Sequence, residues 1–157
     1  MNSLTQQFEI LHATVKLRDL LLDAASDNDL AYRLPGDNPT LGELFRELGE
    51  VAHSYVQAFK TFKQDFEYRH PDPTIAGSKA RLEEWFKTLD REIETALTAL
   101  SDEDIQSKIV VRPHWQAPVT IMFHTYRECF LIFAAKAAVY FRALKKPLPD
   151  QVLWWVG

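Results

Sequence analysis

Helical periodicity is the feature that most constrains what this chain can fold into. Long stretches repeat apolar residues at the three- and four-residue spacing of one helix face. Strand-like alternation is scarce, and the only segment that resembles a strand is the short run 108–111. The sequence holds only five glycines, and its turn signals are few and well separated. These patterns predict an all-α protein.

Three breaks divide the chain into four predicted helices. The breaks at 32–40 and 69–78 contain prolines and glycine, which do not continue a helix, and the third break is the long segment 101–119. The predicted helices span Ser3–Ala25, Thr40–Phe66, Ser78–Leu100 and Pro118–Leu144. After the last helix, the apolar end of the chain, 152–157, is expected to pack back onto the helices.

The second predicted helix has a clear start signal. Thr40 and Glu43 form a Thr-x-x-Glu capping box, in which each side chain accepts a hydrogen bond from an otherwise unpaired backbone N–H. No repeat, low-complexity tract or domain boundary interrupts the chain, and 157 residues suffice for one domain with its own core. We therefore predict a single domain, 1–157, folded as an antiparallel up-and-down four-helix bundle with a long connection before the last helix.

Composition excludes several classes of function. Hydrophobic residues make up 46% and charged residues 25%, which is typical of a globular protein. The net charge is −4 and the basic residues are scattered, so we expect no nucleic-acid binding. The longest apolar region, 129–141, is interrupted by Lys136 and is too short for a clear membrane span. With no signal-peptide pattern and a single cysteine, Cys129, we expect a cytoplasmic protein that does not associate with membranes.

No established catalytic motif is present. A phosphate loop, a nucleotide fingerprint, zinc-type cysteine spacing and a His-Glu-x-x-His sequence are all missing. The remaining possibility is a site assembled from separate helices. On the second helix His53 falls off the apolar face, beside Glu50, and is predicted to lie on the solvent side. Glu47 falls at the flank of the apolar face, near Leu44 and Val51, from where it could lean into a pocket.

The last helix offers a second pair of candidates. His124 and Glu128 are four residues apart, so they share one side of the helix and could bind a metal together. Arg127, Arg142 and Lys145 fall on the same stripe, however, and a stripe of mixed charge is typical of a solvated face.

Cys129 falls on the opposite side of that helix, toward the predicted core. A buried cysteine usually behaves as a small hydrophobic residue. A reactive thiol would need a basic or polar neighbourhood, which the sequence does not reveal.

Two segments resemble the DinB/YfiT-like superfamily. The stretch TLGELFRELGEV, from Thr40, is similar to the Thr-capped T-x-G-E-L motif of that family's second helix. The stretch 124–149 is similar to its last helix, which ends in an aromatic residue, Leu and Arg and is followed by proline; here Tyr140-Phe141-Arg142 precedes Pro147. The resemblance covers nearly the whole chain in element order. It implies a four-helix bundle, often dimeric, with a divalent metal held in many members by three histidines.

At the metal positions this sequence departs from the family. The resemblance places the second-helix histidine seven residues after the capping threonine, where Glu47 stands, and the paired histidines of the last helix near Cys129 and Phe133. Glutamate and cysteine can bind zinc, but phenylalanine cannot ligate any metal. The resemblance therefore implies a degenerate metal site at these three positions.

Two functions follow from that comparison. The first is a small-ligand-binding or interaction protein that has lost the family's metal site, so that no cofactor is expected. The second is a metal-dependent enzyme, of thiol-transfer or hydrolase type, that binds Zn or Ni through an altered set drawn from Glu47, His124, Glu128 and Cys129. Whether the protein is an enzyme, and what its ligand is, stay open.

A homodimer is the expected assembly. The aromatic residues Trp154 and Trp155 in the tail are candidates for the interface. Leu131, Ala135 and Ala138 interrupt the polar stripe of the last helix with apolar and small residues, which suits close contact between helices.

Overall fold

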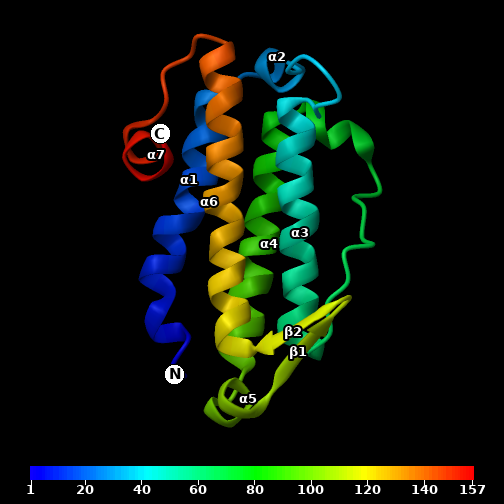
Figure 1. The fold of residues 1–157 in the computed structure, drawn as a ribbon, viewed down its shortest axis with the longest axis vertical. Helices are drawn as coiled ribbons and strands as arrows, with labels where there is room; N and C mark the ends of the chain where they lie inside the picture. Colours follow the sequence, from blue (N-terminus) through cyan, green and yellow to red (C-terminus); the bar gives the residue numbers. More distant parts are fainter.

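Four long helices lie side by side and make the chain mostly helical (Figure 1). The computed structural model describes all residues, 1–157. The long helices are α1 (Phe8–Ala24), α3 (Leu41–Thr61), α4 (Lys79–Ala99) and α6 (Val119–Ala143). They correspond to the four predicted helices. Thirty-eight buried residues from these helices and their connections form one hydrophobic cluster, which agrees with a single core.

The directions of the helices differ from the antiparallel up-and-down order that we predicted. α1 and α6 run one way along the long axis, and α3 and α4 both run the other way (Figure 1). The predicted directions are wrong because of the connection between α3 and α4, residues 62–78. It returns along the outside of α3 to the end of the molecule where α3 begins, so α4 runs in the same direction as α3. At that end the fold leaves no room for a side chain at Gly42, whose Cβ would lie 1.8 Å from the carbonyl oxygen of Ala76.

The remaining helical elements are short and lie in the connections or at the ends. They are η1 (Thr5–Gln7), α2 (Asp27–Leu30), η2 (Pro73–Gly77), α5 (Asp102–Ser107) and α7 (Asp150–Val156). α7 is the predicted apolar tail, and it packs against α6 and α1 through the fully buried Val152. None of the helices combines the length and the apolar character that crossing a bilayer would require.

A β-hairpin closes the end of the molecule where α3 ends. β1 (Ile109–Arg112) pairs antiparallel with β2 (Trp115–Pro118), with Val110 opposite Ala117. The sequence indicated the first strand but not its partner. The two-residue turn places His114 at a φ of 64°, a conformation that the sequence pattern did not signal. The long connection before the last helix is therefore present, as α5 and this hairpin.

The hairpin also explains why α3 ends five residues before the predicted Phe66. Phe62 adopts a left-handed conformation with a φ of 57°, which stops the helix without a glycine. The next residues pair with β1: Val111 N–H donates to Phe62 O at 3.0 Å, and Gln64 N–H donates to Val111 O at 2.9 Å. Phe66 thus lies outside the helix. We call residues 62–72, which run back along α3, the strap.

Candidate functional site

A capping box marks the start of α3, the helix that carries Glu47. Glu43 N–H donates to Thr40 Oγ1 at 3.0 Å, and Thr40 N–H donates to the Glu43 carboxylate at 2.7 Å, as the sequence predicts. These bonds lower the pKa of Glu43, with burial opposing them and the charge of Arg33 assisting. Glu47 stands one turn further on. The cap thereby fixes where α3 begins.

Glu47, Cys129 and Phe133 line the same groove between α3 and α6. The groove has a volume of about 140 Å³. Its remaining lining is mostly aliphatic and comes from Leu44, Leu48, Val51, Ile132 and the Lys136 side chain. The three positions that the resemblance singled out therefore converge in space. We call this the α3–α6 groove.

Phe133 forms the floor of the α3–α6 groove. Its side chain is only 3% exposed, and its ring lies 4.8 Å from that of Phe45 in an edge-to-face arrangement. Such aromatic pairs are favourable beyond the area that they bury. The phenyl ring therefore serves the core at a position where a histidine could hold a metal.

Cys129 is half-buried, and its thiol is oriented by neighbouring oxygens. It donates to Thr125 O at 3.3 Å, and Tyr55 Oη lies 3.8 Å away. Burial raises the pKa of the Cys129 thiol, although the contact with Tyr55 opposes that rise. Burial also raises the pKa of Tyr55. A thiol in this state is a poor nucleophile at neutral pH.

Glu47 is exposed at the rim of the groove, so its carboxylate stays hydrated. Glu47 and Cys129 carry atoms that could coordinate a metal ion, whereas the phenyl ring of Phe133 carries none. No group of three or more His, Cys, Asp or Glu side chains in the chain is arranged to hold a metal ion. The residues present do not fit a three-ligand centre.

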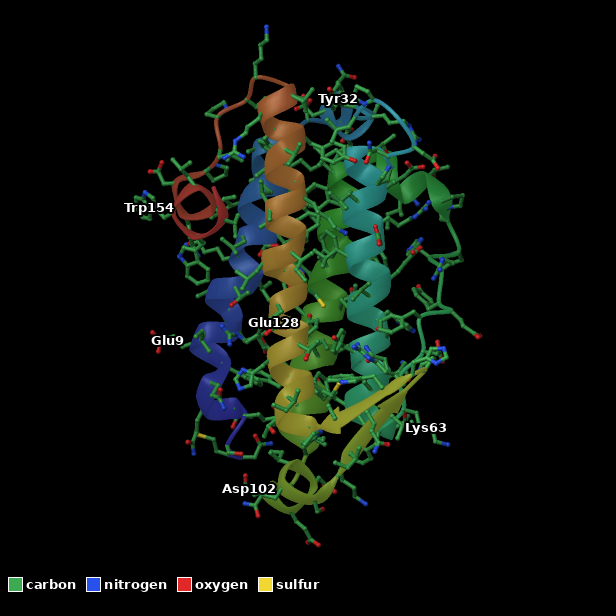
Figure 2. The ribbon with its side chains drawn as sticks, viewed as in Figure 1. Glu9, Tyr32, Lys63, Asp102, Glu128 and Trp154 are labelled. Atoms are coloured by element: carbon green, nitrogen blue, oxygen red, sulfur yellow. The ribbon has the colours of Figure 1, made fainter.

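His124 and Glu128 lie outside the α3–α6 groove. Both are solvent-exposed, and Figure 2 shows Glu128 on the outer face of α6. His124 Nδ1 lies 3.4 Å from the guanidinium of its own-helix neighbour Arg127. His124 and Glu128 thus face solvent, although Arg127 of the same stripe is half-buried and its guanidinium lies 3.5 Å from Thr14 Oγ1 of α1. Cys129 points to the interior side of the helix.

His53 is less exposed than predicted. It is half-buried because its ring stacks on Tyr68 of the strap, with 3.8 Å between ring centroids. Burial lowers the pKa of His53, so the imidazole is neutral at pH 7. Its contact holds the strap against α3, and it does not face the groove.

A second, larger pocket adjoins the α3–α6 groove on the other side of Glu47. It lies between α3 and the strap, has a volume of about 580 Å³ and shares Glu47 and Val51 with the groove. Arg46 and Glu50 contribute from α3, and Arg69 contributes from the strap. The sequence analysis missed this pocket, because nothing local reveals that the strap folds back beside α3. We call it the α3–strap pocket.

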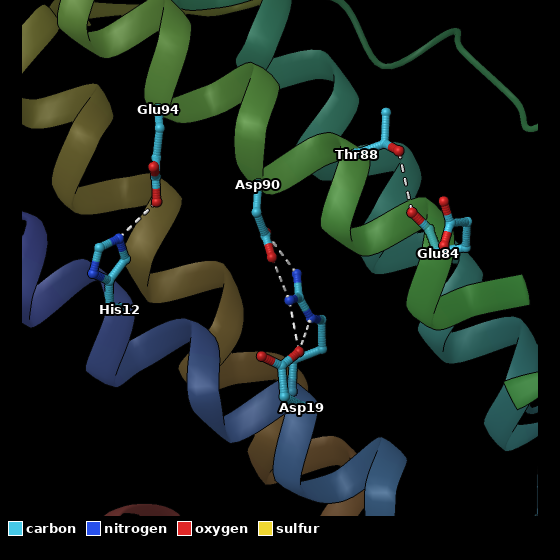
Figure 3. A network of polar contacts seen from close by, with 7 residues as sticks. His12, Asp19, Glu84, Thr88, Asp90 and Glu94 are labelled. Atoms are coloured by element: carbon cyan, nitrogen blue, oxygen red, sulfur yellow. Dashed lines mark hydrogen bonds and ion pairs between the residues drawn. The ribbon is translucent and has the colours of Figure 1, made fainter. Parts of the chain in front are cut away.

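Charged residues also gather between α1 and α4, with a different outcome (Figure 3). Arg18 is 2% exposed, and its guanidinium donates to both oxygens of Asp90 at 2.9 and 2.7 Å and to Asp19 at 2.6 Å. It also lies over the Phe86 ring, 4.4 Å from the centroid. Burial opposes its charge, but Asp90 and then Asp19 raise the pKa of Arg18.

The sequence signal for Arg18 was available. It stands four residues before Leu22 and seven after Leu11, so it lies on the buried stripe of α1. An arginine on such a stripe predicts a charged partner from the facing helix, because a buried charge is rarely left unpaired. Asp90 is that partner.

Comparison with known proteins agrees with this architecture. The sequence profile of the DinB superfamily matches residues 11–135, so the chain belongs to that superfamily and the resemblance is confirmed. The crystal structure of the DinB-like protein YjoA from Bacillus subtilis is similar in fold, with a TM-score of 0.68 over 91% of this chain and 97% of that one. The two chains are 14% identical, so the likeness concerns the fold alone. No curated protein matches the sequence.

Proposed function

We propose that this protein is a small-ligand-binding member of the DinB superfamily that does not use the family's three-histidine metal site. The observation that carries the proposal is the buried Phe133 in the same groove as Glu47 and Cys129. A phenyl ring supplies no lone pair to a metal and adds apolar surface where a ligand would bind. The alternative is a metal-dependent thiol-transfer or hydrolase-type enzyme. It would need His124 or Glu128, which are exposed on the outer face of α6.

Metal analysis tests the first half of this proposal. Protein purified without chelator is expected to carry far less than one equivalent of zinc or nickel. Stoichiometric metal that disappears in Glu47→Ala would overturn the proposal and favour the enzyme. The matched control is Glu9→Ala, which removes an exposed carboxylate on α1, outside the groove and outside the candidate ligand set.

Ligand binding tests the second half. The α3–α6 groove has nearly the volume of an apolar cavity, roughly 150 Å³, that is known to hold benzene. Phenol and benzyl alcohol, titrated into protein with labelled isoleucine methyl groups, are expected to shift the Ile132 resonance. Ile10 serves as the internal control, since it is similarly exposed but lies on α1. Equal shifts at both methyl groups, or none, would contradict binding in the groove.

We further propose a homodimer in a reducing compartment such as the cytoplasm. Support for the compartment is the half-buried free thiol of Cys129. Support for the dimer is the apolar outer surface of α7, where Trp154 is 76% and Trp155 44% exposed (Figure 2). On α6, Ala135 is exposed, but Ala138 is buried within the chain and is therefore not available to a partner.

The role of α7 is best tested with point variants. Removing residues 151–157 would also remove the buried Val152, so lost assembly could reflect a damaged core. Trp154→Glu avoids this problem. Light scattering is expected to give a dimer mass for the unchanged chain and a monomer mass for the variant. An unchanged mass would remove α7 from the interface.

A further inference from the structure

A further cavity lies between α1 and α4, beside the ion pairs of Arg18 (Figure 3). Its volume is about 180 Å³, slightly more than the roughly 150 Å³ of a cavity known to hold benzene. Leu11, Val15 and Ile93 give it an apolar wall, and Tyr126 also lines it. A ligand of about five or six heavy atoms would therefore fit. We call this space the α1–α4 cavity.

The polar groups of the α1–α4 cavity carry more negative than positive charge. Asp19, Asp90 and Glu94 each contribute a carboxylate. Their ion-pair partners are Arg18, which contacts both aspartates, and His12, which contacts Glu94. Even with His12 protonated, these two bases leave one negative charge unbalanced. The carboxylate side chains are between 29% and 53% exposed, so the cavity opens to solvent.

The adjoining cavity, which shares Arg18's two aspartates, does not cancel that surplus. Its other carboxylates are those of Asp23 and Glu83, and its other base is Lys87. Lys79 Nζ lies 3.8 Å from Asp23. These four charges balance one another, so the surplus of negative charge stays with the α1–α4 cavity.

Tyr126 brings a buried hydroxyl group to this cavity, and no other group of the chain hydrogen-bonds to it. The residue is only 1% exposed. Burial raises the pKa of Tyr126, and the nearby charge of Asp90 adds to the rise. The hydroxyl is not among the polar atoms that are sealed in the core without a partner, so it opens on the cavity. Buried polar groups nearly always have a partner, so this hydroxyl points to a group bound in the cavity.

The chemistry of the cavity favours a ligand that donates hydrogen bonds. Carboxylates only accept, a phenol oxygen can accept, and the guanidinium of Arg18 already donates to both aspartates. An ammonium group has three donors and no acceptor, so it matches these groups in charge and in hydrogen bonding. The carboxylates are not arranged to hold a metal ion. The apolar wall would accommodate a short alkyl chain attached to the ammonium.

We infer that this protein binds small primary alkylamines in the α1–α4 cavity, with the ammonium at the Tyr126 hydroxyl and the carboxylates, and the alkyl chain against the apolar wall. The cavity lies outside the α3–α6 groove, so this inference does not rest on the proposed function. The step is binding alone, and no covalent bond changes.

The experiment compares an amine with a neutral molecule of the same size. Isoleucine methyl groups of the full-length protein are followed by NMR at pH 7.5, where Ile93 reports on the cavity and Ile132, in the α3–α6 groove, is the internal control. n-Butylamine is protonated at this pH, like a lysine side chain. We expect it to bind at least about tenfold more tightly than butan-1-ol, since hydrogen bonds to charged groups are stronger. Added salt should weaken only the amine.

A second cation separates hydrogen bonding from simple attraction between charges. Butyltrimethylammonium carries the same charge but has no N–H group, so we expect it to bind at least about tenfold more weakly than n-butylamine. Tyr126→Phe removes only a hydroxyl that makes no bond within the chain, so the fold should be kept. This variant is expected to weaken n-butylamine at least about fivefold and to leave butyltrimethylammonium unchanged.

Glu94→Gln tests the carboxylates without disturbing the pairs of Arg18. It is expected to weaken n-butylamine at least about threefold, because one acceptor loses its charge. Glu84→Gln is the matched control, since Glu84 is an exposed carboxylate of the same helix that lines neither cavity (Figure 3). It removes the same charge and should leave the affinity unchanged.

Several outcomes would overturn the inference. The first is equal binding of n-butylamine and butan-1-ol at Ile93, or no saturable shift there at millimolar concentration. Equal binding of the two cations, or an equal loss in Glu84→Gln and Glu94→Gln, would show general attraction to an acidic surface. An affinity that survives both Tyr126→Phe and Glu94→Gln would place the ammonium elsewhere. The proposed function is judged separately, by the phenol titration at Ile132.

Discussion

The α1–α4 and α3–α6 interfaces both contain charged residues, but they use them in opposite ways. Between α1 and α4, the buried Arg18 is fully engaged by Asp90 and Asp19, so its charge serves the fold (Figure 3). Between α3 and α6, Glu47 stands exposed at the rim of an apolar groove and forms no ion pair with another side chain. A charge that is paired within the protein serves the fold, whereas an unpaired charge beside apolar surface is available to a ligand.

The largest expected loss of stability comes from removing the buried Arg18 between α1 and α4. Arg18→Met removes the hydrogen bonds to Asp90 and Asp19 and the contact with the Phe86 ring. Removing one member of a buried pair costs about 3–5 kcal/mol, and we expect the lower end because Asp90 is 29% exposed and can be hydrated. Urea unfolding measures the change. Glu47→Met, under the same conditions, should cost under about 1 kcal/mol, because Glu47 is exposed and forms no ion pair. Similar losses for both variants would contradict the distinction.

Restoring the family's three histidines tests whether the α3–α6 groove has the geometry of a metal site. The triple variant Glu47→His, Cys129→His and Phe133→His would place three imidazoles in the α3–α6 groove. We expect one zinc or nickel per chain, and metal at a hundredfold excess over its Kd would stabilise the fold by about 2.7 kcal/mol. Metal analysis and melting with and without chelator provide the measurement.

The matched control for this restoration keeps the phenyl ring. Glu47→His with Cys129→His supplies two imidazoles and is expected to bind metal far more weakly. If the triple variant binds no more than this double variant, the three positions do not converge as a metal centre would require.

A smaller effect is expected at Cys129. Burial raises the pKa of its thiol, so less thiolate is present at pH 7.5 than in free cysteine. Alkylation by iodoacetamide should be at least about tenfold slower than for free cysteine, and should accelerate as the pH rises above the ordinary thiol pKa. The protein unfolded in urea is the control, and its single cysteine makes the signal unambiguous. Alkylation faster than free cysteine at pH 7 would indicate an activated nucleophile and favour the enzyme.

The parts of the fold that could be predicted from the sequence depend on local signals. The capping box of Thr40 and Glu43 acts over three residues, and the helical spacing of α6 separates exposed Glu128 from core-facing Phe133. The grouping of Glu47 with the residues of α6 came from the family resemblance. Periodicity alone assigns a residue to a face and does not identify the facing helix.

The parts that were missed depend on contacts between distant residues. The strap is held by the pairing of Gln64 with Val111 and by the bond from His70 N–H to Glu50. No pattern within the strap encodes those partners. Because the strap returns along α3, α3 and α4 run in the same direction and the α3–strap pocket forms between α3 and the strap. Neither feature could be predicted without knowing the path of the strap.

The smallest expected effect lies within the α1–α4 interface itself. His12 Nε2 is 2.7 Å from Glu94 Oε1, a distance as short as those around Arg18, but the two side chains are 56% and 43% exposed. Exposed pairs contribute about 0.2–1 kcal/mol because water solvates both partners. His12→Gln should therefore lower the free energy of unfolding by under about 0.5 kcal/mol. A loss comparable to that of Arg18→Met would show that proximity, rather than burial, decides which charges the fold depends on.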